Sequence, residues 1–243
     1  MPDLAASGVL VTDKHPYQGF IPKDARGVIL GGTPPHRFCA RTGLVKGDMD
    51  FYYGSRVNLF WDAMEVVFGE ELSFIHTLRA AEKPLPYSEV RPLFESFLAS
   101  HNLGIADTLH TYFRKGQSSA DQDILPIRFN PRLWQYLSSR PQLTHLFCSS
   151  HHVSQWLLQS LLNSKRIRFI GTDAVSFSFE DEYQPQRQLR IIHLHSPSRA
   201  ASKDLLRLVP PGKDIKDKSP LQQQIIALGT LYRRDFAEAG IID

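Results

Sequence analysis

Short apolar runs alternate along the chain with longer stretches in which apolar residues recur at helical spacing. RGVILGG (Arg26–Gly32) and LTHLFCS (Leu143–Ser149) have the length and composition of buried strands that end in loops. Two more strands are expected over Arg166–Ile170 and Leu189–Leu194. A polar, acidic and proline-containing stretch around Glu180 to Gln186 separates these two.

Helices are expected over residues 57–68, 88–98, 153–162 and 219–236. The first has Asn58 in its first turn, and Gly69 follows it at the position of a left-handed C-terminal cap. The last begins with Ser219 as N-cap, followed by a proline in the first turn. Each of these helices presents an apolar stripe to a core.

Strands that alternate with helices predict the α/β class, with a parallel or mostly parallel sheet covered on both faces. In such a sheet the ligand site lies outside the carboxyl ends of the strands. The loops expected to hold the chemistry are therefore Gly31–Phe38, Cys148–His152, Gly171–Asp173 and His195–Ala201.

Length and composition set further limits. The 243 residues have the size of one α/β domain, residues 1–243, in which residues 1–15 are expected to form a loosely ordered tail. A formal net charge of +3 permits a basic groove but is far from that of a strongly basic nucleic-acid protein.

Cysteine content and apolar run lengths bear on the location of the protein. Two cysteines, Cys39 and Cys148, exclude a disulfide framework and a cysteine-based metal site. The chain starts without the features of a secretory signal, and no apolar run approaches membrane-spanning length. We therefore expect a cytoplasmic protein that does not contact a membrane.

The segment FYYGSRVNLFW, residues 51–61, is the densest group of distinctive residues. An aromatic ring at the mouth of a loop offers a stacking surface for a nucleobase, and an asparagine amide can orient a water or bind a base edge. The same residues also have an ordinary interpretation, because Phe60 and Trp61 can anchor a helix in the core and Asn58 can be a first-turn polar residue. The residues alone leave both interpretations open.

The loop GGTPPH, residues 31–36, places flexible and then rigid backbone directly after a strand. Such a loop can hold main-chain groups close to a ligand, although a tight turn between strand and helix would have the same sequence. It matches neither a dinucleotide fingerprint nor a P-loop.

Taken together, the order strand, G-x-[N/D/T]-P-[G/P], then YYG-x-x-x-N-x-F-W resembles the uracil-DNA glycosylase superfamily, nearest its mismatch-type and hypoxanthine-excising branch. Two further pieces are similar in the same order: GIADTL with the following GQSSADQDI, and HSPSRA from His195. The resemblance spans most of residues 18–240, and its most specific part is the YYG to FW segment.

The resemblance implies a three-layer α/β/α sandwich around a central, mostly parallel four-stranded sheet. It also implies that a nucleotide is flipped from DNA and that the N-glycosidic bond of its base is hydrolysed. Neither a cofactor nor a metal is implied, and DNA is the expected partner, with no obligate protein partner evident.

The resemblance assigns roles by position in the matched motifs. Asn58 and His195 correspond to catalytic groups. His193 is an alternative to His195, and it can equally be an ordinary strand residue. Tyr53 corresponds to the residue that stacks on the base. Further base contacts are expected from Gly32, Thr33 and Ser149, and DNA contacts from Arg56, Ser196, Pro197, Ser198 and Arg199.

Three departures from the family pattern affect the expected chemistry. Thr33 stands where many relatives carry Asp or Asn, and it cannot act as a carboxylate base. Ser55-Arg56 replaces the usual His-Pro after the stacking aromatic. The segment Cys148–His152 replaces the asparagine with which uracil-specific members read the base edge. Strict uracil specificity is therefore not expected.

Other titratable residues are expected to be ordinary loop groups. Asp121 and Asp123 have the spacing of residues that cap or solvate a loop, and Asp107 is expected to order a wall of the pocket. His151 and His152 are adjacent and lack a third residue at metal-ligand spacing, so a metal is not expected.

The first hypothesis is a monofunctional DNA glycosylase of base-excision repair that acts on hypoxanthine or uracil in DNA. No lysine stands in the matched motifs to form a Schiff base with the sugar, so hydrolysis is expected. A divergent member that binds nucleic acid or a nucleobase without cleaving it is the alternative. An unrelated nucleotide-handling α/β enzyme would need a phosphate loop that is not found.

Overall fold

The structure, a computed structural model, describes residues 9–163, 168–172, 176–180, 187–199, 201–210 and 215–243. It divides into two units, each built from two segments of sequence. Unit 1 comprises Met1–Leu44 and Leu98–His193, and unit 2 comprises Val45–Phe97 and Leu194–Asp243. Folding of residues 1–243 as a single domain stays a prediction.

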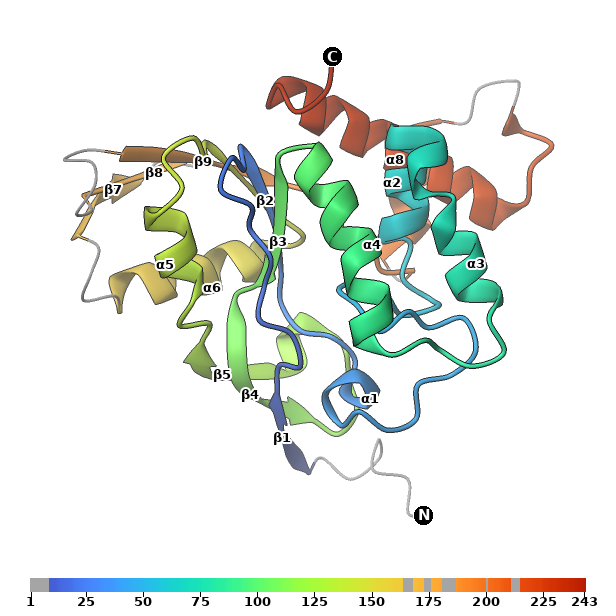
Figure 1. Cartoon of the computed structure of the whole chain (residues 1–243), viewed down its shortest axis with the longest axis horizontal. Coiled ribbons are helices and arrows are strands. Elements are labelled where there is room, and N and C mark those ends of the chain that lie inside the picture. The colour runs from blue at the N-terminus through green and yellow to red at the C-terminus, as the bar shows by residue number, and fades with distance from the viewer. Residues whose placement is uncertain (1–8, 164–167, 173–175, 181–186, 200, 211–214) are drawn as a thin grey trace. The chain divides into compact units, whose positions relative to one another are not determined.

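Unit 1 contains a six-stranded sheet with the strand order β3-β2-β6-β9-β8-β7 (Figure 1). Its strands are β2 (Gly27–Gly31), β3 (Leu103–Asp107), β6 (His145–Cys148), β7 (Arg168–Thr172), β8 (Ser176–Glu180) and β9 (Arg187–His193). The neighbours β3, β2, β6 and β9 are parallel, whereas β8 and β7 continue the sheet with antiparallel pairing. The predicted α/β class with four parallel strands flanked by helices is confirmed, and two antiparallel strands extend the sheet.

The core of unit 1 explains why β2 reads as an unbroken apolar run. Val28, Ile29 and Leu30 are all fully buried, as in parallel strands that are covered on both faces. On one face the core is completed by α5 (Leu133–Ser138) and α6 (His151–Leu162), which lie along the sheet (Figure 1). These helices contribute Trp134 and Trp156 to the cluster, among other residues.

A second, three-stranded antiparallel sheet in unit 1 was not predicted. It has the order β1-β4-β5 and consists of β1 (Leu10–Lys14), β4 (Leu109–Lys115) and β5 (Ile124–Phe129). The expectation of a loosely ordered tail up to residue 15 is therefore wrong for residues 10–15. Strand β1 is stabilised by pairing with β4, about a hundred residues further on, which no local pattern around β1 could indicate.

The predicted strands differ from the observed ones in detail. Neither β3 nor β8 was predicted. Gly104 interrupts the short apolar run of LGIAD, and three of the five residues of SFSFE are serine or glutamate, which weakens the apolar signal of both. The strand expected over Arg166–Ile170 begins outside the described residues and continues to Thr172 as β7.

Unit 1 also contains a short helix, α1 (His36–Cys39), and the 3-10 turn η3 (Asp121–Asp123). Helix α4 (Tyr87–Ser100) begins in unit 2 and ends in unit 1, because the boundary falls between Phe97 and Leu98. The helix expected over residues 88–98 begins at Tyr87 and continues to Ser100, with Pro92 inside it.

Unit 2 is helical. Its elements are α2 (Phe60–Phe68), η2 (Gly69–Leu72), α3 (Phe74–Ala80), the first part of α4, η4 (Ala201–Asp204), α7 (Leu205–Leu208) and α8 (Pro220–Glu238). Helix α2 packs against α8, where Phe60 contacts Tyr232 with ring centroids 5.8 Å apart. Trp61 extends this core toward α4 and lies 4.3 Å from the ring of Phe94. The aromatic residues of the FYYGSRVNLFW segment thus anchor the core of unit 2.

Helix α2 begins two residues later than Asn58, so this residue precedes the helix and is not in its first turn. Gly69 follows the helix with a φ of 68° and a ψ of −140°. Its φ is positive, as glycine permits, but its ψ is not that of the expected left-handed cap. In α8, Ser219 and Gln222 form a capping box: the Ser219 hydroxyl accepts from the Gln222 N–H, and the Gln222 side chain accepts from the Ser219 N–H.

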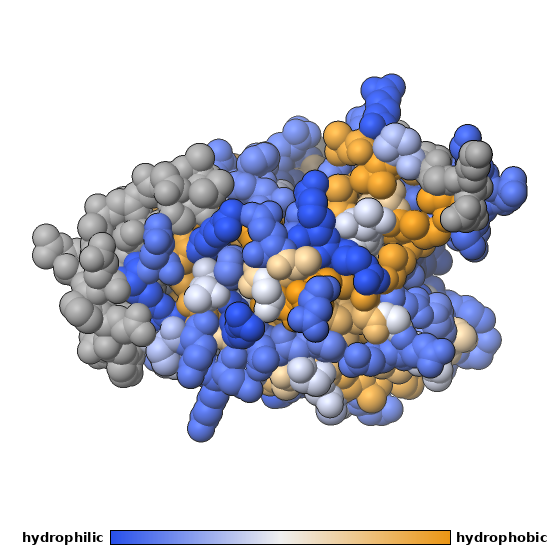
Figure 2. All heavy atoms as spheres, turned by 90° about the horizontal axis from the view of Figure 1, so that it is seen from above, coloured by the Kyte–Doolittle hydropathy of each residue, from blue (hydrophilic) through white to orange (hydrophobic). Residues whose placement is uncertain are grey.

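The surface face shown in Figure 2 carries mainly hydrophilic side chains, with hydrophobic ones in groups between them. Within the described ranges, no helix combines the length and apolar character needed to cross a membrane.

The capping box predicts the effect of a substitution at the start of α8. Replacing Ser219 with alanine removes the acceptor for the Gln222 N–H and should lower the free energy of unfolding by about 1 kcal/mol. Ser219→Asp keeps an acceptor there and should unfold close to the wild type. Chemical denaturation followed by circular dichroism measures both; equal loss of stability in the two variants would contradict the capping role.

Candidate functional site

The segment that precedes Asn58 is a compact loop organised by one carboxylate. Asp48 is 1 % exposed, and its two carboxylate oxygens accept hydrogen bonds from the N–H groups of Val45 and Arg56 at 3.1 and 2.9 Å. Between these residues the chain turns back on itself, and the Met49 N–H donates to the Gly54 carbonyl at 2.7 Å. Asp48 therefore closes the loop that carries the two tyrosines.

Gly54 is required where this loop crosses itself. A Cβ at this position would lie 1.8 Å from the carbonyl oxygen of Met49 and 2.8 Å from that of Phe51. Both neighbours are main-chain atoms, which cannot move aside as the end of a flexible side chain can. The glycine of the YYG motif is therefore needed because any side chain at this position would overlap the main chain.

The three aromatic residues before Gly54 have different environments. Phe51 stacks on Phe94 with ring centroids 4.6 Å apart, and the Tyr52 carbonyl accepts from the Trp61 indole N–H at 2.7 Å. Tyr53 has a φ of 54°, rare for a non-glycine residue, and its ring stacks on Phe60 at 4.3 Å. Phe60 therefore covers one face of the Tyr53 ring.

The side chain of Asn58 both ends this loop and starts the helix. Its Oδ1 accepts a hydrogen bond from the Phe60 N–H at 2.9 Å, while its main-chain N–H donates to the Ser55 carbonyl at 2.8 Å. Among the described residues, the Nδ2 amide donates to no protein group. Because the amide oxygen already accepts from the Phe60 N–H, the amide N–H groups are the part of Asn58 that can bind a ligand.

Two segments expected to contribute to the site are paired by their main chains. Asn58 forms an antiparallel bridge with Ser198, and the Leu59 N–H donates to the Pro197 carbonyl at 3.0 Å. Both segments belong to unit 2, although they lie far apart in sequence. The structure thus brings together the YYG to FW segment and the loop Ser196–Arg199, which we call the Ser-Pro loop.

His195 holds the Ser-Pro loop in shape at its two ends. Its Nε2 lies 3.2 Å from the Ala201 carbonyl, and because a carbonyl only accepts, Nε2 carries the proton. Its own carbonyl accepts from the Tyr232 hydroxyl at 2.8 Å. A neutral His195 then has only a lone pair at Nδ1, so it could donate to a departing base only as the imidazolium.

Between these ends, serine hydroxyls shape the loop and its tip faces solvent. The Ser198 Oγ accepts from the Ala201 N–H at 3.2 Å and lies 3.3 Å from the Ser196 Oγ. Pro197 is buried, whereas Arg199 is exposed. Arg56, the other cation predicted to contact DNA, is also exposed.

An ion pair that was not predicted supports the turn around Asn58. Arg79 of α3 donates from Nη2 to the Asp62 carboxylate at 2.8 Å and to the Asn58 carbonyl at 3.4 Å. Burial raises the pKa of Asp62, and the neighbouring Arg79 guanidinium opposes this shift. A single arginine in a helical sequence carries no signal by which its partner could be found.

In unit 1, the register of the parallel strands places four chain positions at one edge of the sheet. Gly31 is opposite Asp107, and Cys148 is opposite both Leu30 and His193. The loops that begin at Gly32 and Ser149, two of those predicted to hold the chemistry, therefore start side by side. Thr108, the single residue between β3 and β4, lies at the same edge and was not predicted. Gly171 and Thr172 of the predicted Gly171–Asp173 loop belong to β7.

The base-binding candidates of unit 1 lie at this edge. Gly32 is buried against α6, where a Cβ would lie 2.8 Å from the Trp156 ring. The Thr33 hydroxyl oxygen is buried and has no hydrogen-bond partner among the described residues. Ser149 is 8 % exposed, and its N–H donates to the Leu30 carbonyl at 3.0 Å.

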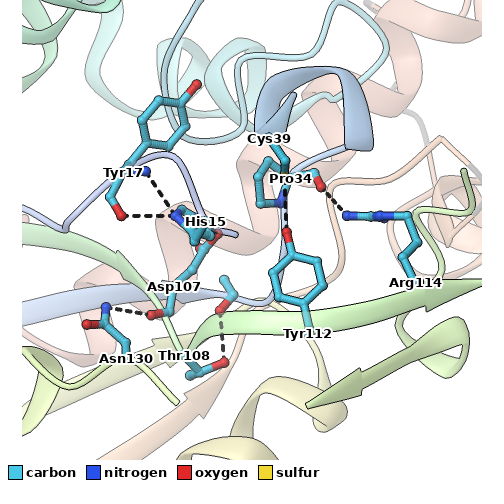
Figure 3. A network of polar contacts seen from close by, with 10 residues as sticks. His15, Tyr17, Pro34, Cys39, Asp107, Thr108, Tyr112, Arg114 and Asn130 are labelled. Carbon is cyan, nitrogen blue, oxygen red and sulfur yellow. Dashed lines mark hydrogen bonds and ion pairs between the residues drawn. The ribbon is translucent and has the colours of Figure 1, made fainter. Parts of the chain in front are cut away.

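A fully buried arginine holds the loop after β2. Arg114 of β4 donates from Nε to the Asp13 carboxylate at 2.7 Å. Its Nη2 donates to the Pro34 carbonyl at 2.6 Å (Figure 3). Its Nη1 donates to the Ser118 carbonyl, so one guanidinium connects two loops. The second Asp13 oxygen lies 2.7 Å from the His36 Nδ1.

A second buried pair lies at the end of β3. His15 and Asp107 meet with 2.5 Å between Nε2 and Oδ2, and the His15 Nδ1 lies 3.0 Å from the Tyr17 carbonyl (Figure 3). The main-chain carbonyl of Asp107 accepts from the Asn130 amide at 3.0 Å. The expectation that Asp107 orders a wall is consistent with this placement, although the pairing with His15 was not predicted.

The remaining titratable candidates are engaged in local contacts. Asp121 accepts from the Ser150 hydroxyl at 2.6 Å and Asp123 accepts from the Ser118 hydroxyl at 2.7 Å, as expected of loop carboxylates. The His193 Nε2 lies 2.9 Å from the Ser154 Oγ. Burial lowers the pKa of His193, and the nearby His151 lowers it further, so the neutral imidazole is favoured.

No group of three or more His, Cys, Asp or Glu residues in the described part of the chain is arranged to hold a metal ion. The predicted site residues fall into two sets by unit. Asn58, His195, Tyr53, Arg56, Ser196, Pro197, Ser198 and Arg199 belong to unit 2, and Gly32, Thr33 and Ser149 belong to unit 1. The role of each stays a prediction.

No family model matches the chain, and no curated protein matches it. Among solved structures, the chain is similar to the solution structure of a "putative Uracil DNA glycosylase" from Methanosarcina acetivorans, with a TM-score of 0.48 and 14 % sequence identity. The similarity covers 93 % of this chain and 98 % of that one.

The crossing at Gly54 predicts that Gly54→Ala opens the loop. Because the new Cβ would overlap the Met49 carbonyl, we expect a loss of unfolding free energy on the order of 2 kcal/mol. Denaturation curves measure this loss, with Val57→Ala, which changes a 45 % exposed side chain in the same segment, as the control. A Gly54→Ala protein as stable as this control would contradict the steric role of Gly54.

Proposed function

We propose that the protein is a monofunctional DNA glycosylase that hydrolyses the N-glycosidic bond of a deaminated base, of the hypoxanthine or uracil type, in DNA. The observation that carries the proposal is the main-chain pairing of the Asn58 turn with the Ser196–Arg199 loop. These are the segments to which the family resemblance assigns the catalytic amide and the DNA contact. If both segments belong to one site, they must lie close together, as their pairing shows they do. The resemblance was based on sequence motifs alone, so this pairing supports the proposal independently.

The contacts of Asn58 suggest which part of the reaction it serves. Cleavage develops positive charge on the sugar and negative charge on the departing base, so donors aimed at the base oxygens lower the barrier. The Asn58 oxygen already accepts from the Phe60 N–H, whereas its Nδ2 donates to no described group. Asn58 is thus suited to donate to the departing base or to the oxygen of the attacking water.

The other roles follow from the same proposal. Tyr53 is the proposed stacking residue for a flipped base, and Phe60 supports its ring from one side. Gly32, Thr33 and Ser149 are proposed base contacts, and the Thr33 hydroxyl has unused hydrogen-bonding capacity among the described residues. A hydroxyl can both donate and accept, which fits bases that present either kind of group. His195 would assist the leaving base only in its protonated form.

DNA contacts are assigned to residues on the surface of unit 2. Arg56 and Arg199 are both exposed, and arginines at such positions bind phosphates through charge-assisted hydrogen bonds. The Ser196–Arg199 loop would enter the minor groove, where short rigid loops are used to wedge base pairs apart. Salt dependence of binding measures such phosphate contacts directly.

An excision assay tests the proposed activity. The full chain is incubated with single-stranded and duplex oligonucleotides that contain hypoxanthine, uracil or xanthine, and abasic sites are detected by alkaline cleavage. Release of a base from at least one substrate is expected. If the chain binds lesion DNA tightly in a salt-sensitive manner but releases no base from any of them, the non-cleaving alternative holds instead.

A pair of substitutions at Asn58 separates catalysis from helix capping. Asn58→Asp keeps an oxygen that accepts from the Phe60 N–H but loses the N–H donors, whereas Asn58→Ala loses both. We expect excision to fall about 100-fold in both variants, as when one donor to a developing anion is removed. Only Asn58→Ala should also lower the melting temperature.

The result that would remove Asn58 from the mechanism is an Asn58→Asp protein with wild-type stability and wild-type excision rate. Single-turnover kinetics with excess enzyme make this comparison independent of product release.

A further inference from the structure

The outward face of the three-stranded sheet β1-β4-β5 in unit 1 has an apolar centre. Leu10, Phe113, Leu125 and Ile127 are 50 %, 37 %, 52 % and 49 % exposed. Phe113 lies directly opposite Leu125 in the strand register. A single exposed leucine is ordinary, but four large apolar side chains on paired strands form a patch of the kind that marks an interaction site. We refer to these four residues and the cations around them as the sheet face.

In β1 and β4, strand alternation explains why Leu10 and Phe113 point outward. In β5 the register shifts between the Pro126–Tyr112 and Arg128–Thr111 pairs, so Ile127 has no partner in β4, and the residues from Leu125 to Arg128 are all exposed. Tyr112 and Arg114, on either side of Phe113 in β4, are fully buried, and Asp13 in β1 is 3 % exposed. The buried side chains form the polar network that holds the loop after β2. Because successive side chains of a strand point to opposite faces, that inward network leaves the other positions on the outside.

The charges on the sheet face all have the same sign. Lys14, Lys115 and Arg128 are exposed, and the strands β1, β4 and β5, whose residues are all described, carry no exposed carboxylate. Their one acidic residue, Asp13, is buried and paired with Arg114. The pKa of His110 is lowered by burial and then by Arg128 and Lys14, which shows that these cations act on the same part of the sheet.

We propose that the sheet face is a docking site for an acidic, apolar-containing segment of a partner protein. Carboxylates of such a segment match Lys14, Lys115 and Arg128, and its apolar side chains cover Leu10, Leu125 and Ile127. Both chemical features of the face then have a counterpart in one ligand. None of these residues is among those proposed for base excision.

Two other occupants fit less well. A DNA backbone would match the cations, but stacking on bases requires aromatic rings, and three of the four apolar side chains are aliphatic. A second copy of this chain docked face to face would bring Lys14, Lys115 and Arg128 against the same cations, which repel one another. The charge pattern therefore favours an acidic protein segment.

A labelled peptide tests the proposal on the full chain. The probe is a short fluorescein-labelled peptide in which glutamate alternates with leucine and isoleucine, and binding is followed by fluorescence anisotropy. One control peptide has lysine in place of every glutamate, and another has alanine in place of every apolar residue. Binding of the first peptide alone is expected, and its affinity should fall as salt is raised.

Surface substitutions locate the site. Ile127→Ser and Lys115→Glu should each weaken peptide binding by roughly tenfold. Leu162→Ser changes a leucine that is 67 % exposed on α6, and Lys83→Glu reverses an exposed charge in unit 2, so both should bind as the wild type does. All four change exposed side chains, and circular dichroism verifies that each variant is folded. Base excision should be the same in all of them.

The proposal is overturned if the glutamate peptide does not bind, or if Ile127→Ser and Lys115→Glu bind it as tightly as the two controls. Weaker binding of duplex DNA by Lys115→Glu with no change for the peptide would identify a nucleic-acid surface instead. Conversion of a dimer to a monomer by Ile127→Ser in analytical ultracentrifugation would identify a contact between copies of this chain.

Discussion

The in-register pairing of the parallel strands β3, β2, β6 and β9 is the constraint on which the rest of unit 1 depends. Parallel strands in register end at the same edge, so the chain leaves β2 after Gly31 next to Asp107, and leaves β6 after Cys148 next to His193. The loops that follow these strands must therefore begin at this edge of the sheet. Any ligand chemistry in unit 1 is built on backbone that the sheet holds rigid.

A buried ion pair makes this edge specific. Arg114 and Asp13 are 0 % and 3 % exposed, and a charge of either kind is costly in such surroundings unless it is paired. Arg114 has additional hydrogen bonds to carbonyls in two loops, including that of Pro34 next to Thr33. The sheet β1-β4-β5 supplies both partners from its inner face. The same alternation sends apolar and cationic side chains to its outer face.

In unit 2, structural and proposed catalytic demands fall on one residue. Asn58 uses its oxygen to start α2 and its main chain to pair with the Ser-Pro loop, and the amide donors remain for a ligand. The loop that leads to it needs Asp48 to bind two N–H groups and Gly54 to let the chain cross itself. This arrangement explains why the YYG to FW segment is so dense in distinctive residues.

Local sequence patterns were sufficient to predict an element wherever its formation depends only on residues close to it in sequence. The apolar runs of β2 and β6, the stripe of α6 and the Ser219 cap of α8 are each determined within a few residues, and the structure has them where they were predicted. The clustering of loops at one sheet edge also followed, because it needs only the alternation of strands and helices. These features required no knowledge of which distant segments meet.

The tertiary structure decided every feature that joins distant segments. The strand β1 forms because β4 pairs with it, Asp107 is buried because His15 reaches it, and the Asn58 turn meets Ser198 through main-chain atoms that any residue possesses. Backbone hydrogen bonds are the same for all side chains, and one buried charge does not indicate in sequence where its partner lies. The sequence by itself therefore determined the class of fold and the candidate residues, and only the tertiary structure decided which of them stand together.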